Sequence, residues 1–314
     1  MVAGRHNMEA PEARRLATRV RESRRLALLK RAGMFGNVDN ATIGRANTYD
    51  DLAGAYHLVH DMFVFQGILQ PNDTRMRIRP WEAQPETATV IAKSQNQVVG
   101  VTSVVFDSPD MGLPTDQAFG AEVDVLRSMG RRICEGTNWA IAHGNTSVMT
   151  ELMRCSLAHA MARGCDDFLG TVSPGHMAFY KLLGFEQIGS IRSYDPDQYD
   201  PVVLVRLNVA DFGRRFANVN ATDGDDEAFL KSYYLVNNPY HRYVQAWQIL
   251  TGRFFADATL VRELFVNRGY LPERCTPAQL DGIRRRWGDE IFEQVAGAQS
   301  PVVTNRSAVA EGVR

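Results

Sequence analysis

The sequence predicts an α+β (mixed α/β) fold with a central mixed β-sheet flanked by helices, followed by an all-helical C-terminal appendage. Three observations predict it. Residues 87–107 hold two β-rich runs around the polar turn SQNQ, a pattern typical of an antiparallel hairpin. A strand pattern at 131–141 is followed by a helical pattern and a further strand, and such a crossover joins parallel strands. From about residue 225 onward only helical patterns remain.

Two helices belong to the first half of the predicted core. Thr48 and Asp51 form a start similar to a capping box, and apolar residues then recur at helical spacing. Residues 113–130 predict the next helix, in which Asp124 and Arg127 can pair because they lie three residues apart. Its buried stripe is expected to hold Phe119, Val123, Leu126 and Met129.

The second half of the predicted core alternates strands and helices. Residues 145–164 predict a helix that begins at an Asn or Thr cap and ends at Gly164. Further strands are expected at 166–172, 185–191 and 202–208. The order is therefore helix, hairpin, helix, strand, helix, strand, helix, strand, strand, with a parallel pair where the 145–164 helix crosses over.

A short helix between the last strands carries two polar side chains of interest. Pro174 and Gly175 indicate its start and Gly184 its end. His176 and Tyr180 are four residues apart, so we expect them to share a helical face. Such a face can carry chemistry, or it can be the polar edge of a packed helix.

Both ends of the chain lie outside the predicted core. Residues 11–32 hold eight Lys or Arg against two Glu, which predicts a basic arm. This arm is either a solvated or partly disordered extension or a docking surface for an acidic partner. Near the other end, Thr276, Pro277 and Gln279 predict a capped helix. Residues 236–247 are expected to pack on the core, to cover the site as a lid, or to form a dimer contact.

The composition excludes several classes of protein. With 314 residues and 45% hydrophobic content the chain can bury a full core. A net charge of -1 argues against a general nucleic-acid or membrane-surface binder. The four cysteines match no zinc or redox spacing, and the N-terminus lacks the apolar core of a signal peptide. We therefore expect a cytoplasmic protein with reduced thiols, no transmembrane segment, no metal and no tightly bound cofactor.

The order of elements, closing in FYKLLGF, resembles the GNAT acyltransferase fold. A wider pattern adds to this resemblance. The segments LVHDMFVFQGIL, MRI, TATVIAK, VVGVTSVVFDSPDMGLPTDQAF, AEVDVLRSMGRRICEGTNWAI and SPGHMAFYKLLGFEQIG together are similar to the catalytic core of FeeM-type N-acyl amino acid synthases. These enzymes are relatives of the acyl-homoserine lactone synthases. The resemblance covers roughly residues 48–208.

The resemblance implies transfer of a long-chain fatty acyl group from an acyl carrier protein thioester to the α-amino group of an amino acid. The loop AHGNTSVM at 142–149 bears on the donor, because a coenzyme A pyrophosphate is usually cradled by a Gly-rich loop. This loop has one glycine and no basic residue before it, which favours the carrier protein. Arg131, Arg132 or the basic arm could bind the acidic carrier surface. Acyl-coenzyme A stays an open alternative.

Attack of an amine on a thioester needs a deprotonated amine, a polarised carbonyl and a proton for the leaving thiolate. Strand alternation places Glu135 on one face with Ile133, Thr137 and Trp139, so a carboxylate lies among mostly apolar neighbours. A desolvated carboxylate has a raised pKa and can act as a base, or it can hold the substrate ammonium. The structural alternative is an ion pair.

By resemblance to GNAT enzymes, Tyr180 is the candidate general acid for the leaving thiolate, because an unperturbed Tyr keeps its proton at neutral pH. It could equally pack the helix on the sheet. His176, one turn earlier, is a candidate proton relay or a surface residue. Acyl-homoserine lactone synthases resemble this strand in having a Glu that matches Glu135. Their Arg three residues later is Asn138 here.

Candidate substrate-binding residues complete the predicted site. Arg77, inside RMRIRP with Arg75 and Arg79, is the candidate for binding the amino acid carboxylate, with a solvated arginine cluster as the alternative. The remaining candidates are Asn138 and Trp139, and for the apolar surroundings of the substrate Phe106 and Phe179.

Four segments follow from these patterns. They are the basic N-terminal arm (1–46), a GNAT-like N-acyltransferase core (47–209), a helical C-terminal extension (210–298) and a flexible tail (299–314). The leading hypothesis is an N-acyl amino acid synthase. The alternatives are a coenzyme A-dependent N-acetyltransferase of a small amine, an acyl-homoserine lactone synthase, and a non-catalytic carrier-protein or lipid-binding module.

Overall fold

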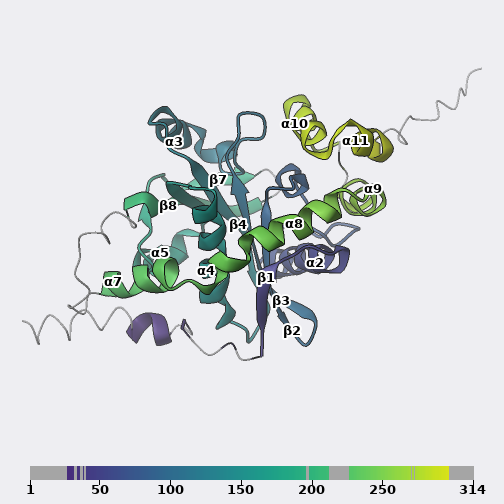
Figure 1. Cartoon of the computed structure of the whole chain (residues 1–314). Coiled ribbons are helices and arrows are strands. Elements are labelled where there is room, and N and C mark those ends of the chain that lie inside the picture. Colours follow the sequence, from purple (N-terminus) through teal and green to yellow (C-terminus); the bar gives the residue numbers. More distant parts are fainter. Residues whose placement is uncertain are drawn as a thin grey trace, which may run out of the picture.

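An eight-stranded mixed sheet forms the centre of the computed structural model, which describes residues 27–31, 34–35, 38, 40–195, 198–211, 226–269, 271 and 273–296. Its order is β1-β2-β3-β4-β5-β8-β6, and β7 pairs with β8 (Figure 1). The strands are β1 (Thr42–Arg45), β2 (Ala88–Ser94), β3 (Gln97–Phe106), β4 (Ile133–Ile141), β5 (Asp167–Val172), β6 (Glu186–Gln187), β7 (Arg192–Asp195) and β8 (Gln198–Asn208).

The predicted hairpin and the predicted parallel pair are both confirmed. β2 and β3 are antiparallel, and Gln95 and Asn96 between them have positive φ, as the favoured two-residue hairpin turn requires. β4 and β5 run parallel, as expected from the crossover helix between them. Their pairing ends at Glu135 and Leu169, although β4 continues to Ile141. The sheet therefore opens between these two strands.

Helices cover both faces of the sheet. On one face lie α2 (Tyr49–Phe65) and α3 (Asp116–Ser128), and on the other α4 (Val148–Ala162) and α5 (Met177–Leu182), which follows the 3-10 turn η2 (Pro174–His176). Neighbouring residues of β3 point to opposite faces, as a strand requires. Val105 belongs to the core cluster with α2 and α3, whereas Val104 belongs to the cluster with α4 and α5.

Local sequence signals account for the starts and ends of these helices. The Thr48 side chain accepts a hydrogen bond from the backbone N–H of Asp51, so the predicted α2 start is confirmed. Asp124 and Arg127 form the expected ion pair at 2.8 Å. The predicted Asn or Thr cap of α4 is wrong: its N-cap is Ser147, whose side chain makes no capping bond. The Asn145 amide instead donates to the preceding loop carbonyls.

Three further details differ from the sequence-based expectations. Met129 was expected in the buried stripe of α3 but is 65% exposed, because the helix ends at Ser128. The strand expected at 185–191 is reduced to the two residues of β6. β1 and β7 were not expected; β1 lies within the segment 1–46 assigned to the arm and pairs with β2 along the sheet edge. Residues 1–26 of that arm and the tail 299–314 lie outside the described residues.

The C-terminal third is helical where the structure describes it, as expected. Its elements are α7 (Asp226–Lys231), η3 (Ser232–Val236), η4 (Pro239–Tyr243), α8 (Val244–Phe255), α9 (Ala258–Val261), η5 (Arg262–Arg268), α10 (Pro277–Trp287) and α11 (Asp289–Ala296). Thr276 and Gln279 form the predicted capping box of α10. Figure 1 shows α8 crossing from the α4 side of the molecule towards α9 and the end of α2 that lies near it.

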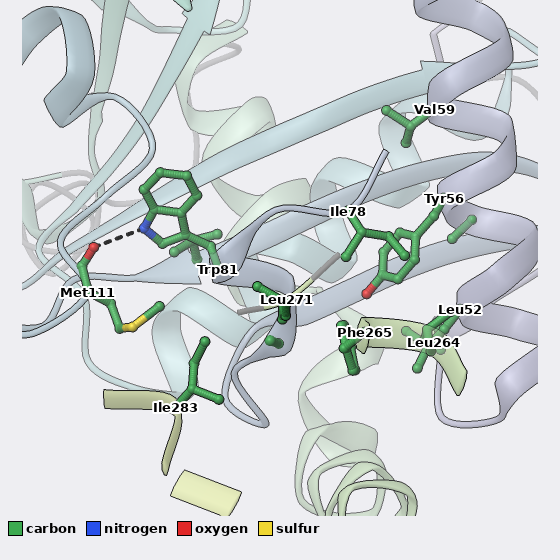
Figure 2. Packing of buried hydrophobic residues seen from close by; sticks show 14 of the residues in the cluster. Leu52, Tyr56, Val59, Ile78, Trp81, Met111, Leu264, Phe265, Leu271 and Ile283 are labelled. Atoms are coloured by element: carbon green, nitrogen blue, oxygen red, sulfur yellow. Dashed lines mark hydrogen bonds between the residues drawn. The ribbon is translucent and has the colours of Figure 1, made fainter. Parts of the chain in front are cut away.

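This extension packs against the core on two sides. On the α4 side, the Tyr240 hydroxyl donates to Glu151 at 2.6 Å, and Trp247 stacks on His159. On the α2 side, Phe265 packs in one cluster with Tyr56 (Figure 2). Residues 236–247 therefore pack on the core. Among the described residues, no helix combines the length and the apolar character needed to cross a membrane, and all four cysteines are free thiols.

Candidate active site

A buried carboxyl group marks the centre of β4. Glu135 has no exposed surface, and its Oε2 accepts a hydrogen bond from the backbone N–H of Thr115 at 2.8 Å. Thr115 lies just before α3, so the loop between β3 and α3 holds one side of the carboxyl. The other oxygen, Oε1, has no hydrogen-bond partner in the described part of the chain. One oxygen is therefore fixed by a hydrogen bond, and the other is buried without a partner among the described residues.

The surroundings of Glu135 favour a proton-accepting role. Burial raises its pKa to about 8, and the negative charges of Asp116 and Glu82 act in the same direction. The Thr115 N–H and the positive charge of Arg79 oppose this rise. A pKa close to the working pH is the condition under which a carboxylate can take a proton from an ammonium group and release it again.

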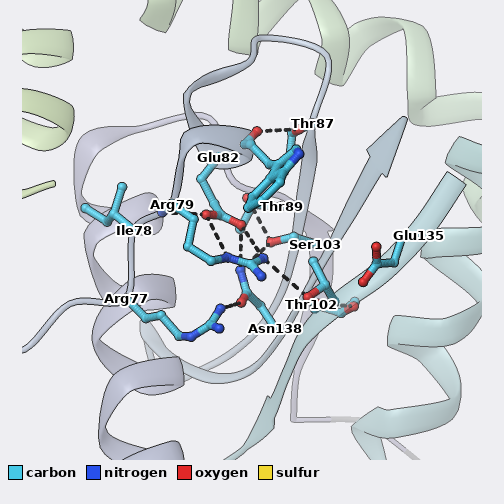
Figure 3. A network of polar contacts seen from close by, with 12 residues as sticks. Arg77, Ile78, Arg79, Glu82, Thr87, Thr89, Thr102, Ser103, Glu135 and Asn138 are labelled. Atoms are coloured by element: carbon cyan, nitrogen blue, oxygen red, sulfur yellow. Dashed lines mark hydrogen bonds and ion pairs between the residues drawn. The ribbon is translucent and has the colours of Figure 1, made fainter. Parts of the chain in front are cut away.

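A network of charged and amide side chains lies between the segment 77–84 and the sheet (Figure 3). The Glu82 carboxylate is its hub, because Oε1 accepts from Arg79 Nη2 at 2.8 Å and from Asn138 Nδ2 at 2.9 Å. Arg77 Nη1 donates to Asn138 Oδ1 at 2.8 Å. Arg79 also reaches Thr137 Oγ1 at 3.3 Å. All five residues are buried, so the network is shielded from bulk water.

The predicted arginine cluster separates into two environments. Arg77 and Arg79 are 6% and 8% exposed, so the alternative of a solvated cluster does not apply to them. Arg75 turns away with a positive φ and pairs at the surface with Asp61 at 2.7 Å. The prediction that all three arginines share one face is therefore wrong for Arg75, because the chain reverses direction there.

A β-bulge in β4 brings Asn138 into this network. Val101 of β3 pairs with Ala140 and Ser103 pairs with Thr137, so the two residues 138 and 139 stand opposite one residue of β3. Asn138 adopts a φ of 56°, a conformation that Asn tolerates better than most residues. The bulge breaks the strict alternation of side chains along the strand.

The bulge overturns the prediction that Trp139 shares a face with Glu135. Trp139 packs with the clusters beneath α4, beside Gly136 and Met153. It lines a narrow cavity of about 10 Å³ on the α4 and α5 side of the opening between β4 and β5. Gly136 is required at the wall of this cavity, since a Cβ atom there would lie 2.5 Å from the ring of Phe168.

Tyr180 of α5 lines the same cavity. Its ring packs edge-on against Phe185, with the centroids 5.4 Å apart. Burial raises its pKa to about 12, so the hydroxyl keeps its proton at neutral pH. No residue that the structure describes forms a hydrogen bond with this hydroxyl, which leaves its proton available to a group in the cavity.

The other predicted site residues lie apart from the cavity. His176 belongs to the 3-10 turn before α5 and is exposed, whereas Tyr180 is buried, so the expected shared helical face does not form. Phe179 is half-buried and contacts Tyr180 edge-on at 5.9 Å. Phe106 lies under the Arg163 guanidinium at 4.6 Å, at the far end of β3. The cavity lining does not include these three residues.

The two halves of the site meet at the opening of the sheet. Glu135 and Leu169 form the last pair between β4 and β5, and Leu169 also lines the cavity. The carboxyl of Glu135 lies on the α3 side of this opening, and Tyr180 lies on the α5 side. The Glu135 carboxyl and the Tyr180 hydroxyl thus lie on opposite faces of the sheet near the point where β4 and β5 separate.

The family model of the N-acyl amino acid synthase FeeM matches residues 54–208. Over these residues the chain is similar to the FeeM family. The predicted resemblance is confirmed, and the FeeM-type core is a GNAT-fold N-acyltransferase. The matched residues include Arg77, Glu135, Asn138 and Tyr180, whereas α7 to α11 of the C-terminal extension lie outside the match.

Several solved structures are similar to the chain. FeeM from uncultured soil microbes is 22% identical over 54% of this chain and 90% of that chain, with a TM-score of 0.49. The acyl-homoserine lactone synthase LasI is 16% identical over 53% and 87%, with a TM-score of 0.41. The coenzyme A-dependent acyl-homoserine lactone synthase MesI is 15% identical over 58% and 97%, with a TM-score of 0.36. No curated protein matches the chain.

Two groups that contact the candidate residues were not predicted from the sequence. Glu82 follows Arg79 by three residues, and this spacing was the one available signal for their pairing. The Thr115 N–H carries no side-chain signal, since a backbone donor is common to nearly all residues. Both groups reach the site only because the loops before β2 and α3 fold back onto β4.

Proposed function

We propose that the protein transfers a long-chain fatty acyl group from an acyl carrier protein thioester to the α-amino group of an amino acid, giving an N-acyl amino acid. The FeeM family match supports this proposal. The observation that carries it is the buried Glu135 carboxyl, which has one hydrogen-bonded and one unpartnered oxygen at the point where the pairing of β4 and β5 ends.

Glu135 acts as the base in this proposal. Its Oε1 takes a proton from the substrate ammonium, and the neutral amine attacks the thioester carbonyl. The C–N bond forms as the C–S bond breaks, so the products are an amide and the free phosphopantetheine thiol. The attacking nitrogen then loses a second proton, and the thiolate accepts a proton either from that nitrogen directly or from Tyr180, which the nitrogen reprotonates. The buried carboxyl then returns its proton to the solvent.

Tyr180 and the bulge of β4 act on the thioester. The proposal places the thioester on the α5 side of the sheet, where the protonated Tyr180 hydroxyl lines the cavity and donates to the departing sulfur. A bulge leaves one residue of β4 without a partner on β3, and β5 has already separated from β4. A backbone N–H at this position can therefore polarise the thioester carbonyl.

Arg77 is the proposed anchor for the acceptor's carboxylate. The planar guanidinium of Arg77 has the fork geometry that suits a carboxylate, and its orientation is set in part by its hydrogen bond to Asn138. Because Arg77 is only 6% exposed, its attraction to a carboxylate is less screened by water than at the surface. Asn138 fixes the guanidinium orientation and is itself fixed by Glu82. The acceptor would thus be held between Arg77 and Glu135.

The loop between β4 and α4 supports a carrier-protein donor. Ser147 at its end makes no side-chain cap, and the Asn145 side chain bonds within the loop. This loop contains one glycine, whereas a pyrophosphate-binding loop usually contains several. Arg131 is engaged by Asp167, so it is a weak candidate for the carrier surface, whereas Arg132 is exposed. The free thiols support a cytoplasmic setting for this reaction.

The test is mass spectrometry of products after incubation of the purified protein with palmitoyl-loaded acyl carrier protein and a mixture of common amino acids. Palmitoyl-coenzyme A replaces the carrier protein in a parallel reaction, and Glu135→Gln is the matched control. An N-acyl amino acid formed from the carrier protein, and lost in the variant, is expected. Product from coenzyme A alone would replace the proposed donor, and no product from either donor would contradict the proposal.

A further inference from the structure

We propose that Arg286 and Trp287 of α10 are positioning residues of the acyl-acceptor site, through which the C-terminal extension holds the two segments that surround Glu135. The proposal rests on the proposed function, in which Glu135 is the base. It concerns residues beyond the FeeM match, which ends at residue 208. The FeeM-type core is thus completed by helices that the matched family segment does not contain.

The first held segment is the loop between β3 and α3. Arg286 forms a bidentate ion pair with Asp110: Nη1 donates to Oδ2 at 2.7 Å, and Nη2 donates to Oδ1 at 3.1 Å. It also donates to Ser108 Oγ at 3.3 Å. Both charged side chains are largely buried, at 16% and 17% exposure. Hydrogen bonds from Arg286, Ser108 and Arg285 hold the pKa of Asp110 well below its usual range.

Close packing accompanies this ion pair. A Cβ atom on Gly282 of α10 would lie 2.8 Å from Asp110 Oδ2 and 3.1 Å from Met111 Sδ. A side chain at this position would force the Asp110 carboxylate or the Met111 thioether to shift. The two hydrogen bonds from Arg286 and the close contact at Gly282 therefore fix the position of residues 110 and 111 relative to α10.

The loop transmits this constraint to Glu135. Met111 is buried, and its carbonyl accepts from Trp81 Nε1 at 3.0 Å. The Leu113 N–H donates to Asp116 Oδ2 at 2.7 Å, which closes the turn that contains Thr115. The Thr115 N–H is the donor to Glu135. The loop is thus tied to α10 at one end and to the catalytic carboxyl at the other.

The second held segment runs from Arg77 to Gln84. Trp287 Nε1 donates to the carbonyl of Ala83 at 2.8 Å, and Arg274 Nη1 donates to the carbonyl of Ile78 at 3.3 Å. Ile78 lies in one buried cluster with Phe265 and Leu271 (Figure 2). Arg79 and Glu82 of the network lie between these two tethered carbonyls.

The pKa of Glu135 depends on the charged groups that face it, so movement of these two segments would change that pKa. These groups are Arg79 and Glu82 on the tethered segment, Asp116 on α3, and the neighbouring Cys134 thiol on β4. Loosening the loop removes the Thr115 donor, which stabilises the carboxylate form. A base that has lost a donor to its charged form titrates at higher pH.

The test compares Arg286→Ala and the milder Arg286→Lys with Arg284→Ala in the full-length chain. Arg284 lies on the same helix but pairs with Asp289 and Glu293 of the C-terminal end, away from the loop. The pH dependence of kcat/KM is measured for the amino acid, together with KM for the acyl donor. Separately, the Glu135 carboxyl is titrated by NMR in protein carrying ¹³C-labelled Glu, with Glu135→Gln to assign its signal.

Both Arg286 variants are expected to shift the Glu135 titration upward, by about one pH unit for Arg286→Ala. The acid limb of kcat/KM should move with it, lowering kcat/KM for the amino acid about tenfold at pH 7, while donor KM changes less than twofold. Arg284→Ala should behave as wild type. Trp287→Phe, which keeps the ring but removes the donor to Ala83, should raise KM for the amino acid.

An unmoved Glu135 titration in both Arg286 variants would overturn the proposal, as would equal shifts in Arg286→Ala and Arg284→Ala. If Arg286→Ala does not fold, Arg286→Lys decides, since it keeps the charge and removes the two-armed geometry. The NMR titration needs no turnover. A shifted titration together with a fully active Glu135→Gln would therefore support the positioning role and refute Glu135 as the base.

Discussion

Glu135 Oε2 lies 2.8 Å from the backbone nitrogen of Thr115, twenty residues earlier in the chain, while Glu135 Oε1 has no partner among the described residues. Since burial also raises the pKa of this carboxyl to about 8, the group combines a fixed position with proton affinity near neutrality. A strand and a loop, neither sufficient alone, create the proposed base.

Replacing Glu135 by Gln should lower kcat by about 10² to 10⁴-fold, the usual contribution of a positioned general base. In the wild-type protein, kcat/KM should rise with pH through about 8 as the carboxyl loses its proton. Acyl-transfer rates measured between pH 6 and 9.5 check both statements. A pH-independent wild-type rate, or a Gln variant with wild-type kcat, would contradict them.

Glu135 should also make the wild-type protein less stable as pH rises. Its folded-state pKa of about 8 lies above the ordinary value of 4.5, so the folded state binds more protons than the unfolded state between these values. Within this window its contribution to the free energy of unfolding falls by up to about 1.4 kcal/mol per pH unit. Glu135→Gln lacks this dependence, so denaturant titrations should show it gaining on the wild type from pH 5 to 8.

The Tyr180→Phe variant tests the proposed proton donor. We expect kcat to fall by about 10²-fold with little change in stability, because the hydroxyl has no partner within the described chain and the ring packing against Phe185 stays. His176→Ala, one turn earlier and exposed, is the control and should keep wild-type kcat. Steady-state kinetics and thermal unfolding of both variants decide. Equal kcat in Tyr180→Phe and wild type would exclude the role.

Arg77→Lys should raise KM for the amino acid about tenfold and leave KM for the acyl donor unchanged. Lysine keeps the charge but loses the planar fork that bonds Asn138 and a carboxylate together. Arg75→Lys, two residues earlier, alters an exposed ion pair with Asp61 and should leave both constants near wild type. A change confined to donor KM would assign Arg77 to the acyl side instead.

Glu82→Gln should reduce the free energy of unfolding by about 3–5 kcal/mol, because it removes one charge of a buried ion pair. The pair it breaks is 10% and 0% exposed. Glu263→Gln breaks an exposed pair with Arg268 and should cost much less than Glu82→Gln. Urea unfolding of the two variants measures the difference, and similar losses would show that the Glu82 network contributes little.

The site could be predicted from the sequence only where short-range patterns decide it. Alternation along β4 up to Thr137 was enough to predict that Glu135 lies among apolar neighbours, whereas packing of Tyr180 on the sheet was one of two alternatives left open. Beyond Thr137, the prediction for Trp139 failed. The bulge at Asn138 depends on the register between β3 and β4, which residues of one strand alone do not encode.

The sequence by itself determined the order of most elements, with β1 and β7 as exceptions. The Thr48 cap, the turn at Gln95 and Asn96, and the capping box at Thr276 act within four residues, so local chemistry is sufficient for them. The tertiary structure decided which distant groups meet: the Thr115 donor, the Glu82 hub, and α10 against the loop at Asp110. These contacts join residues 20 to 176 positions apart, and only the packing of the whole chain brings such residues together.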